Sequence, residues 1–313
     1  MTLSAHRLDA GHHPSVPLPR RGGPLVGGYR LLSRIGKGGT ATVFLATPVA
    51  GGPPVAVKMI RHDAGVDSGE REFTLASTVD VARTAAPITH GVTATGSYLV
   101  TAYLRDYRCA AGMRGGTMSL ASLLTFGGEL AVTLASLHDS GVVHCDVKPS
   151  NLLVGDDDVR VIDFGISQYL GERPVDDGFV RCSRGWAAPE QLRGDPLAPS
   201  ADVFAWGSLL AYLSTGFHPF AGRHEADWIR RVGSGQPDLF GLHPGVEAVV
   251  RAALAHDPRD RPSAHELTAI CRDGLRRAST PEPATRPRPA AGRADWVEEA
   301  TAACAVVDIA EVE

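Results

Sequence analysis

The feature that most restricts this 313-residue chain is a short segment in which polar side chains interrupt apolar runs. Residues 142–153 read VVHCDVKPSNLL, which places His144, Asp146, Lys148 and Asn151 within eight positions. Burying such groups is costly unless each meets a partner, so this composition indicates a site. Asp146 can accept a hydrogen bond from an incoming hydroxyl, Lys148 can neutralise a phosphoryl group, and Asn151 can bind a divalent metal.

A glycine-rich turn precedes this segment in the chain. Residues 35–43 read IGKGGTATV, and Gly36, Gly38 and Gly39 would let backbone N–H groups approach a phosphate closely. A plain hairpin turn has the same composition, so this turn by itself carries little information about function.

The strand that follows strengthens the interpretation. Residues 53–60 read PPVAVKMI, and Lys58 is the one charged residue in this apolar run, which favours a carboxylate or phosphate partner. Glu72 on the next predicted helix is the expected partner, and Glu70 is the second candidate. Only three of the 31 basic residues are lysines, and all three lie in these motifs. Arginine-favouring codon use explains the scarcity, and the role of lysine as a point charge on phosphate explains where the three remain.

A second acidic position follows an apolar strand. Residues 161–167 read VIDFGIS, and Asp163 precedes a Phe-Gly pair, which suits a metal-binding carboxylate at a hinge. Taken singly, Asp146 could cap a turn and Asp163 could end a strand. The ordered set of glycine-rich turn, strand lysine, helix glutamate, HxDxKxxN and DFG argues against that simpler interpretation.

With these motifs in order, residues 29 to about 272 resemble a eukaryotic-type serine/threonine protein kinase of the kind that bacteria also possess. The resemblance covers about three quarters of the chain. It implies an α+β, bilobal fold with a small β-rich lobe and a larger helical lobe. It also implies ATP and Mg²⁺ (or Mn²⁺) as cofactors and a protein Ser/Thr hydroxyl as acceptor.

The resemblance also assigns individual roles. It gives catalytic roles to four side chains, which are Asp146 (the base), Lys148, Lys58 and Glu72. It gives metal binding to two, Asn151 and Asp163. It assigns the nucleotide to these two, to Lys58 and to a further set: Ile35, Gly36, Gly38, Gly39, Val43, Ala56, Thr101, Ala102, Leu104 and Leu153. In this set Val43, Ala56 and Leu153 would enclose the adenine, Thr101 would be the gatekeeper, and the backbone of Ala102 and Leu104 would face the adenine edge.

Three further positions separate this pattern from small-molecule phosphotransferases of similar shape. WAAPEQL supplies an APE-like sequence ending in Glu190, ADVFAWG supplies Asp202 to brace the catalytic loop, and HDPRDRPSA supplies Arg261. The resemblance pairs Glu190 with Arg261, and a bidentate pair there would fix the floor of the peptide-binding region. Two solvated charges are the alternative.

The sequence departs from the family pattern at Cys145, where most such kinases have an arginine that grips a phosphate on the activation loop. Between Asp163 and Glu190 the only hydroxyls are Ser167, Tyr169 and Ser183. We therefore expect activity without activation-loop phosphorylation, with Ser183 placed near Asp146 and Lys148. Cys145 and Cys182 are either inert buried thiols or a reversible disulfide.

Two other functions stay open at this stage. A nucleotide-binding pseudokinase scaffold would fit Cys145 and the scarcity of hydroxyls, and a small-molecule kinase would share the catalytic loop. The complete set of chemical residues argues against the scaffold, and the APE-like segment, Asp202 and Arg261 argue against the metabolite enzyme.

The remaining expectations concern organisation. We predict strands over 29–48, 53–60 and 96–104, and helices over 70–81, 119–141, 199–216 and 245–258. The expected domains are a flexible leader (1–27), a kinase domain (28–273, with the lobes divided at 104/105), a linker (274–294) and an acidic tail (295–313). The tail is a candidate docking segment, because Trp296 and its valines would otherwise be exposed.

Charge and cysteine content limit the partners and the location. A net charge of −4 argues against nucleic-acid binding. The absence of an 18-residue apolar run argues against a membrane span, and the leader lacks an apolar h-region. Five scattered cysteines without CxxC spacing indicate reduced thiols. These features predict a cytoplasmic protein.

Overall fold

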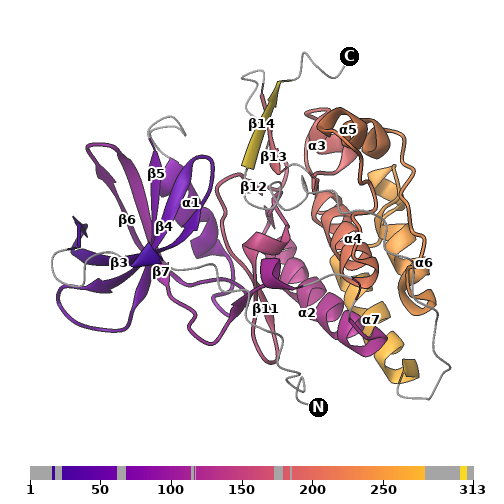
Figure 1. The fold of residues 1–313 in the computed structure, drawn as a ribbon, viewed down its shortest axis with the longest axis horizontal. Helices are drawn as coiled ribbons and strands as arrows, with labels where there is room; N and C mark the ends of the chain where they lie inside the picture. Colours follow the sequence, from indigo (N-terminus) through magenta and orange to yellow (C-terminus); the bar gives the residue numbers. More distant parts are fainter. Residues whose placement is uncertain are drawn as a thin grey trace.

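The chain folds into two lobes, as the resemblance predicts (Figure 1). The structure is a computed structural model that describes residues 16–17, 23–61, 68–113, 116, 118–172, 179–183, 185–278 and 304–308. The N-terminal lobe is built on a curled sheet, and the C-terminal lobe is mainly helical. The α+β, bilobal prediction is therefore confirmed.

The N-terminal lobe is a seven-stranded antiparallel sheet with one helix. Its strands run in the order β1-β3-β4-β5-β7-β6, and β2 pairs with β3. The elements are β1 (Val16–Pro17), β2 (Leu25–Val26), β3 (Tyr29–Lys37), β4 (Ala41–Pro48), β5 (Val55–Arg61), α1 (Ser68–Thr78), β6 (Pro87–Thr93) and β7 (Gly96–Ala102). In β5, Val55 and Val57 are buried with Leu31 in the small core of this lobe. Because side chains alternate along a strand, Ala56 and Lys58 lie on the other face of the sheet.

The C-terminal lobe is assembled around a long central helix. Its helices are α2 (Leu120–Asp139), α3 (Pro189–Leu192), α4 (Ser200–Thr215), α5 (Glu225–Gly233), α6 (Pro244–Ala253) and α7 (Ala264–Ala278), with 3₁₀ turns at Ala110–Gly112, Pro149–Asn151 and Pro258–Asp260. The Ser119 side chain caps α2 by accepting from the Ser122 N–H at 3.2 Å. Gly216, at φ 79°, ends α4 in a left-handed conformation. These caps fix where the core helices begin and end.

In the part of the chain that the structure describes, α2 is the one helix long and apolar enough to cross a membrane. It packs against α7 and α4 in the large lobe, and 56% of its apolar 18-residue stretch is buried. Its apolar residues Leu130, Leu134 and Leu137 are fully buried in the core. Its composition is thus explained by its position inside the lobe.

Short strands flank residues 144–151, the segment predicted to be catalytic. β8 (Arg108–Cys109), β10 (Leu152–Val154) and β11 (Val159–Val161) form a three-stranded sheet, and β9 (Val142–Val143) pairs with β12 (Gln168–Tyr169). A third small sheet pairs β13 (Phe179–Ser183) with β14 (Cys304–Asp308). Residues 144–151 therefore lie in a loop between β9 and β10 that is anchored at both ends.

The structure differs from the sequence-based element boundaries in several places. The first helix covers Ser68–Thr78 instead of 70–81. Strand pairing begins before Tyr29, since β1 and β2 both pair with β3, so the predicted flexible leader contains two short strands. The last helix continues to Ala278, inside the predicted linker. Most of the linker, and Trp296 in the predicted tail, lie outside the described residues.

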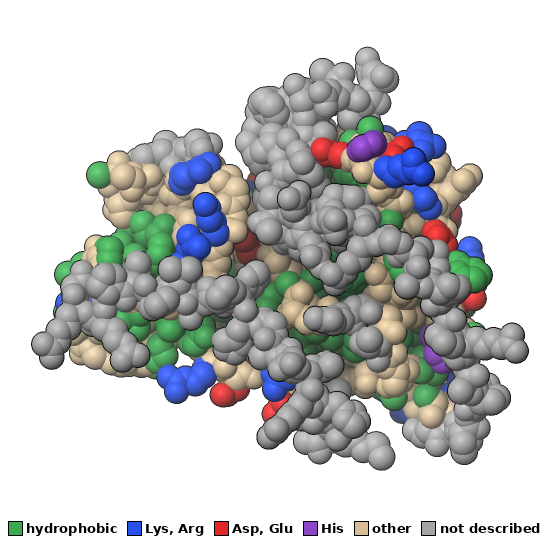
Figure 2. All heavy atoms as spheres, viewed as in Figure 1, with side chains coloured by type: hydrophobic (Ala, Val, Ile, Leu, Met, Phe, Trp, Pro, Cys, Tyr) green, Lys and Arg blue, Asp and Glu red, His purple; other side chains and the backbone are tan. Residues whose placement is uncertain are grey.

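Charges on the face shown in Figure 2 are mixed. Acidic and basic side chains gather together at the upper right, over α5. That helix carries Glu225 and Asp227 in its first turn and Arg230 and Arg231 in its last. The helix dipole stabilises acidic side chains in the first turn and basic side chains in the last. That part of the surface therefore carries charges of both signs.

Candidate active site

Lys58 joins the two lobes through two carboxylates. Its Nζ lies 2.7 Å from both carboxylate oxygens of Glu72 on α1 and 2.7 Å from Oδ1 of Asp163, which follows β11. Glu72 Oε1 also accepts from the Phe164 N–H at 3.2 Å. Glu72, the preferred candidate, is thus the partner of Lys58, whereas Glu70 is exposed on the same helix. The cluster connects β5, α1 and the Asp-Phe-Gly segment.

The pKa values in this cluster follow from burial and mutual attraction. Burial alone would lower the pKa of Lys58, but the carboxylates of Asp163 and Glu72 more than offset this, and the net effect raises its pKa. Burial and the charge of Asp163 raise the pKa of Glu72 overall, although Lys58 and the Phe164 N–H act to lower it. Burial alone would raise the pKa of Asp163. Lys58, together with Lys148 and the Gly165 N–H, nevertheless holds that pKa well below its usual range. Lys58 is therefore cationic and Asp163 anionic at neutral pH.

The catalytic loop brings its three predicted polar residues together. Lys148 Nζ lies 3.0 Å from Asp146 Oδ2, and Asn151 Nδ2 donates to the same oxygen at 2.9 Å and to the Asp146 carbonyl at 3.0 Å. Lys148 also donates to the Ser183 hydroxyl at 2.5 Å, a contact that the sequence predicts. All four side chains are buried. The loop thus holds the carboxylate of Asp146 in a single orientation.

One atom in this network has no partner. Asp146 Oδ1 is buried, and among the described residues no hydrogen-bond donor reaches it. An unpaired buried carboxylate oxygen is costly, and such groups in native proteins call for a specific explanation. An oxygen in this position can accept the proton of a hydroxyl brought to the site.

Asp202 braces the catalytic loop from α4, as the resemblance implies. Its Oδ2 accepts from the His144 N–H and its Oδ1 from the Cys145 N–H, both at 2.8 Å, and Oδ2 also lies 3.0 Å from His138 Nε2. Burial would raise the pKa of Asp202, but the hydrogen bond and charge of His138, with the groups of His144, lower it overall. An ionised acceptor is thus fixed beneath the loop.

The brace acts on a strained backbone. Cys145 has φ 64° and Asp163 has φ 72°, and these are the only non-glycine residues with positive φ in the described ranges. Such conformations cost about 1–3 kcal/mol each and persist only where the surroundings enforce them. Both residues lie next to the predicted phosphoryl-transfer groups, so the strain is concentrated at this site.

Cys145 is a buried thiol. Its Sγ donates to the Val143 carbonyl at 3.4 Å. Burial, reinforced by the nearby Asp202 and Asp146, raises its pKa well above the usual range. Cys182 is also buried, and no disulfide joins the two. The protonated thiol of Cys145 is a poor nucleophile, which favours the inert-thiol alternative.

Two of the three residues assigned to enclose the adenine, Val43 and Ala56, share one face of the N-terminal sheet with Lys58 and Thr101, and the third, Leu153, lies on β10. In the antiparallel register Val43 lies opposite Lys58, and Ala56 lies opposite Thr101. Directly paired residues, and residues two apart on one strand, project to the same side of a sheet. All four residues are half-buried, as are Ile35 on β3 and Leu153 on β10. The arrangement leaves apolar surface for a planar ring next to the Lys58 ammonium.

The hinge and the glycine-rich turn give less specific evidence for a nucleotide site. The Ala102 N–H donates to the Ala86 carbonyl at 2.9 Å, so only its carbonyl could meet an adenine edge. The Leu104 carbonyl accepts from the Tyr107 N–H at 3.4 Å. Gly36, Gly38 and Gly39 all have negative φ, and the Gly38 N–H donates to the Ala41 carbonyl at 2.8 Å. The turn therefore does not require glycine for its backbone conformation.

A buried ion pair fixes the floor of the large lobe. Arg261 donates from Nη1 to Glu190 Oε1 at 2.6 Å and from Nη2 to Oε2 at 3.0 Å, and its side chain is fully buried. It also donates to three carbonyls and lies 5.0 Å over the Phe204 ring. The bidentate pair expected from the sequence is present, and the alternative of two solvated charges is wrong.

Three residues have supporting roles that the sequence did not assign, although His144 was named in the HxDxKxxN motif. His144 is buried, accepts from the Asp146 N–H at 3.2 Å and donates through Nε2 to the Ile162 carbonyl at 3.2 Å, which links the catalytic loop to the Asp-Phe-Gly segment. Gln191 donates to the Cys145 carbonyl at 2.8 Å. His138 supports Asp202. The HxD spacing could have indicated His144, whereas Gln191 and His138 carry no local signal.

The donor set suits a hard divalent cation. Both hydrogen bonds of the Asn151 side chain use Nδ2, which leaves its carbonyl oxygen for a ligand, and Asp163 supplies an ionised carboxylate. Among the described residues no group of three or more His, Cys, Asp or Glu could enclose a metal by itself. Mg²⁺ is commonly held by one or two protein oxygens together with substrate phosphates, and these two residues fit that pattern.

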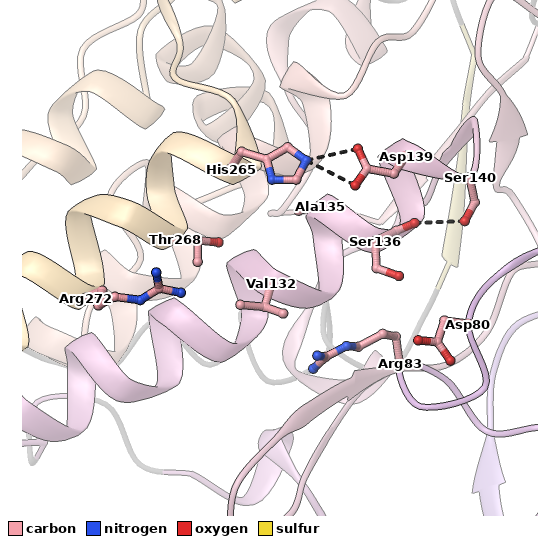
Figure 3. A pocket seen from close by; sticks show the side chains of 10 residues that line it. All are labelled: Asp80, Arg83, Val132, Ala135, Ser136, Asp139, Ser140, His265, Thr268 and Arg272. Carbon is pink, nitrogen blue, oxygen red and sulfur yellow. Dashed lines mark hydrogen bonds and ion pairs between the residues drawn. The ribbon is translucent and has the colours of Figure 1, made fainter.

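An open depression of about 500 Å³ lies apart from these residues, between α2 and α7 (Figure 3). Arg83 and Arg272 extend toward it from opposite sides, and His265 lies 2.9 Å from Asp139 at its upper edge. None of the residues predicted for ATP or catalysis lines it. It has no part in the site described above.

Comparisons with known proteins agree with this geometry. Residues 29–270 match the protein kinase domain family. A probable serine/threonine-protein kinase, PkwA of Thermomonospora curvata, is 36% identical over 253 residues, which is 78% of this chain and 34% of that protein. Serine/threonine-protein kinase AfsK of Streptomyces coelicolor is 31% identical (80% and 32%), and PknJ of Mycobacterium tuberculosis is 30% identical (82% and 45%).

The chain therefore belongs to the protein kinase family, in the eukaryotic-type form that bacteria carry. It spans about a third of the length of the first two of these relatives. The shared part is the kinase domain.

Proposed function

We propose that this chain is a serine/threonine protein kinase that transfers the γ-phosphoryl group of ATP to a protein hydroxyl. The observation that carries the proposal is the buried, unpartnered Oδ1 of Asp146, held in place by Lys148 and Asn151. A carboxylate fixed in this way can orient an acceptor hydroxyl and take up its proton. The names of the relatives give the same class of activity for those proteins.

The residues divide the reaction between them. The acceptor oxygen forms a bond to the γ-phosphorus while the bond from that phosphorus to the β,γ-bridging oxygen breaks, and ADP leaves with that electron pair. Asp146 accepts the hydroxyl proton, and Lys148, 3.0 Å from it, neutralises charge on the transferring group. Lys58, fixed by Glu72, would hold the α- and β-phosphates. Catalysis would thus come from positioning and electrostatics.

Mg²⁺ or Mn²⁺ fits Asn151 and Asp163, and when bound it would neutralise the phosphate oxygens and align the β- and γ-phosphates. The apolar side chains of Val43, Ala56 and Leu153 would hold the adenine.

We also propose that activity does not require activation-loop phosphorylation. Ser167 and Ser183 are both buried, and their hydroxyls already contact the His144 carbonyl and Lys148, respectively. Of the three hydroxyl-bearing residues between Asp163 and Glu190, only Tyr169 is exposed. Cys145 cannot grip a phosphate, and its carbonyl is instead bound by Gln191. Complete phosphatase treatment, verified by intact mass, should leave the initial rate unchanged, and a large loss that autophosphorylation restores would contradict this proposal.

The main proposal is tested by supplying γ-labelled ATP and Mg²⁺ to the purified chain with a generic protein substrate or with a panel of hydroxyl-bearing metabolites. Phosphoamino-acid analysis should show label on serine or threonine of the protein. Turnover of metabolites alone would identify a small-molecule kinase. ATP binding measured by thermal shift, without transfer to any acceptor, would identify a scaffold.

A further inference from the structure

The C-terminal strand of the chain pairs with the activation segment, which is the activation loop between Asp163 and Glu190. β14 runs antiparallel to β13 over its whole length, with Phe179 opposite Asp308 and Ser183 opposite Cys304. Figure 1 shows β14, in yellow, beside β13 above the region between the two lobes. In the described part of the chain, these two strands form a sheet of their own. β14 is thus the strand partner that the structure gives to this part of the activation segment.

β13 requires such a partner to be ordered. A strand with no neighbour exposes a row of unpaired N–H and C=O groups, and a lone strand is not stable in water. The segment CAVVD suits the role, because it has β-branched valines, a single charge and neither proline nor glycine. Pairing through the backbone, with little dependence on side chains, is a common way for an extended segment to dock on an open strand edge.

The position of β13 is transmitted to the catalytic loop. Ser183 is its last residue, and the Ser183 hydroxyl accepts from Lys148 at 2.5 Å. The Ser183 carbonyl then accepts from the Trp186 N–H at 3.1 Å, which starts the buried segment leading to α3. Cys182 on the same strand is completely buried. A shift of β13 would therefore move the hydroxyl that Lys148 holds.

We propose that residues 304–308 form an intramolecular anchor that keeps the activation segment in its productive arrangement. The anchor replaces the phosphate clasp that Cys145 cannot provide. This inference rests on the proposed kinase function. The occupant of the β13 edge is the chain's own C-terminal segment, not a second copy and not a substrate polypeptide.

The connection is long enough for the segment to reach β13 within one molecule. α7 ends at Ala278 and β14 begins at Cys304, so 25 residues lie between them. That number of residues can span up to roughly 80 Å. A domain of about 250 residues has a radius of gyration of only about 18 Å. Pairing in cis therefore needs no extended or strained connection.

Hydrogen exchange tests the pairing directly. Amide exchange is measured by mass spectrometry on the full chain, on a chain that ends at residue 303, and on a Val306→Pro/Val307→Pro variant. Proline removes the N–H, and changing two successive residues affects the ladder whichever of them donates. Peptides covering 179–183 should exchange about tenfold faster in both altered chains, whereas peptides from α2 should not change. Ala302→Pro, outside the paired register, is the matched control and should resemble the full chain.

Activity then tests the consequence. The chain ending at residue 303 should phosphorylate a generic protein about tenfold more slowly, and a synthetic peptide of residues 300–313 should restore the rate. Equal exchange in the full and shortened chains would overturn the anchor, as would an unchanged or raised rate after truncation. Protection at 179–183 that depends on protein concentration would show pairing between copies and would also overturn it.

The exchange experiment does not depend on catalysis. It is repeated on the Asp146→Asn variant, in which the same difference between full and shortened chains should appear. Absence of phosphoryl transfer in every chain would therefore count against the proposed function, while the exchange result alone would decide the anchor.

Discussion

Asp202→Asn is the substitution that most sharply tests how the catalytic loop is held. The carboxylate of Asp202 accepts two backbone N–H groups at 2.8 Å and is fully buried. Asparagine keeps the shape but has one acceptor oxygen, so one N–H would face an amide NH₂ and the other would lose its charged partner. A hydrogen bond to a charged group contributes about 1.5–3 kcal/mol, and a buried unsatisfied donor costs about 1–3 kcal/mol.

The expected loss in the free energy of unfolding is therefore about 3 kcal/mol, measured by urea denaturation. The loop should also lose the geometry that Cys145 adopts at φ 64°, because that conformation persists only while its surroundings enforce it. A displacement of Asp146 by about 1 Å would lower the phosphoryl-transfer rate roughly 100-fold.

Asp139→Asn is the matched control. Asp139 ends α2, its side chain is 64% exposed, and among the described residues its carboxylate pairs with His265. Exposed pairs of this kind contribute about 0–1 kcal/mol, so this variant should be close to wild type in both assays. Equal stability and equal rate for the two variants would refute the argument that Asp202 holds the loop.

Three further substitutions test other parts of the structure. Arg261→Met should lower the free energy of unfolding by about 3–5 kcal/mol, because it leaves the Glu190 carboxylate buried without its partner, and adding Glu190→Gln should recover part of that loss; no recovery in the double variant would contradict the pairing. Burial lowers the pKa of His218 to about 3, so between about pH 6.5 and 3 the unfolded chain binds a proton that the folded chain does not, and stability should fall by about 2–3 kcal/mol from pH 7 to pH 4.5. His218→Asn should flatten that slope in urea titrations, and an unchanged slope would assign it to other groups. Lys58→Met should reduce initial phosphoryl-transfer rates by about 10²–10³, because its two carboxylate partners then repel the phosphates, and a rate near wild type would remove Lys58 from catalysis.

The catalytic loop could be predicted from the sequence because its signals are local. Asp146, Lys148 and Asn151 lie within six positions, and a single loop between two short strands is enough to bring them together. The contact between Lys58 and Glu72 was also predictable, since an isolated lysine in an apolar strand needs an anion and the first turn of the next predicted helix offers Glu70 and Glu72.

Other features depend on long-range packing and left no local trace. The pairing of Lys58 with Asp163 crosses from one lobe to the other, and nothing in VIDFGIS indicates that the carboxylate lies 2.7 Å from that ammonium. The left-handed backbone at Cys145 follows from the position of Asp202, 57 residues further along the chain. The sequence therefore indicated which residues form the candidate site, but not the strained backbone at Cys145 and Asp163.

Short elements were also missed, for a physical reason. β6 (PITHGVT) contains a proline and a glycine, which weaken a strand signal, and α5 has 9 residues, fewer than a helical period needs to be recognised; the prediction included neither. The pairing of β14 with β13 requires a partner far away in the sequence. The β-branched valines in CAVVD show at most that the segment could be a strand, and only the fold shows where it docks.

The measurement that tests the central claim most directly is the rate of γ-phosphoryl transfer to protein serine or threonine by Asp146→Asn beside Asp157→Asn. Asp157 is exposed in the turn after β10 and serves as a control for the loss of one carboxylate charge. We predict that Asp146→Asn lowers the rate by about 10²–10⁴ with ATP binding retained, and that Asp157→Asn matches wild type. A wild-type rate in Asp146→Asn would contradict the assignment of the catalytic base and the function drawn from it.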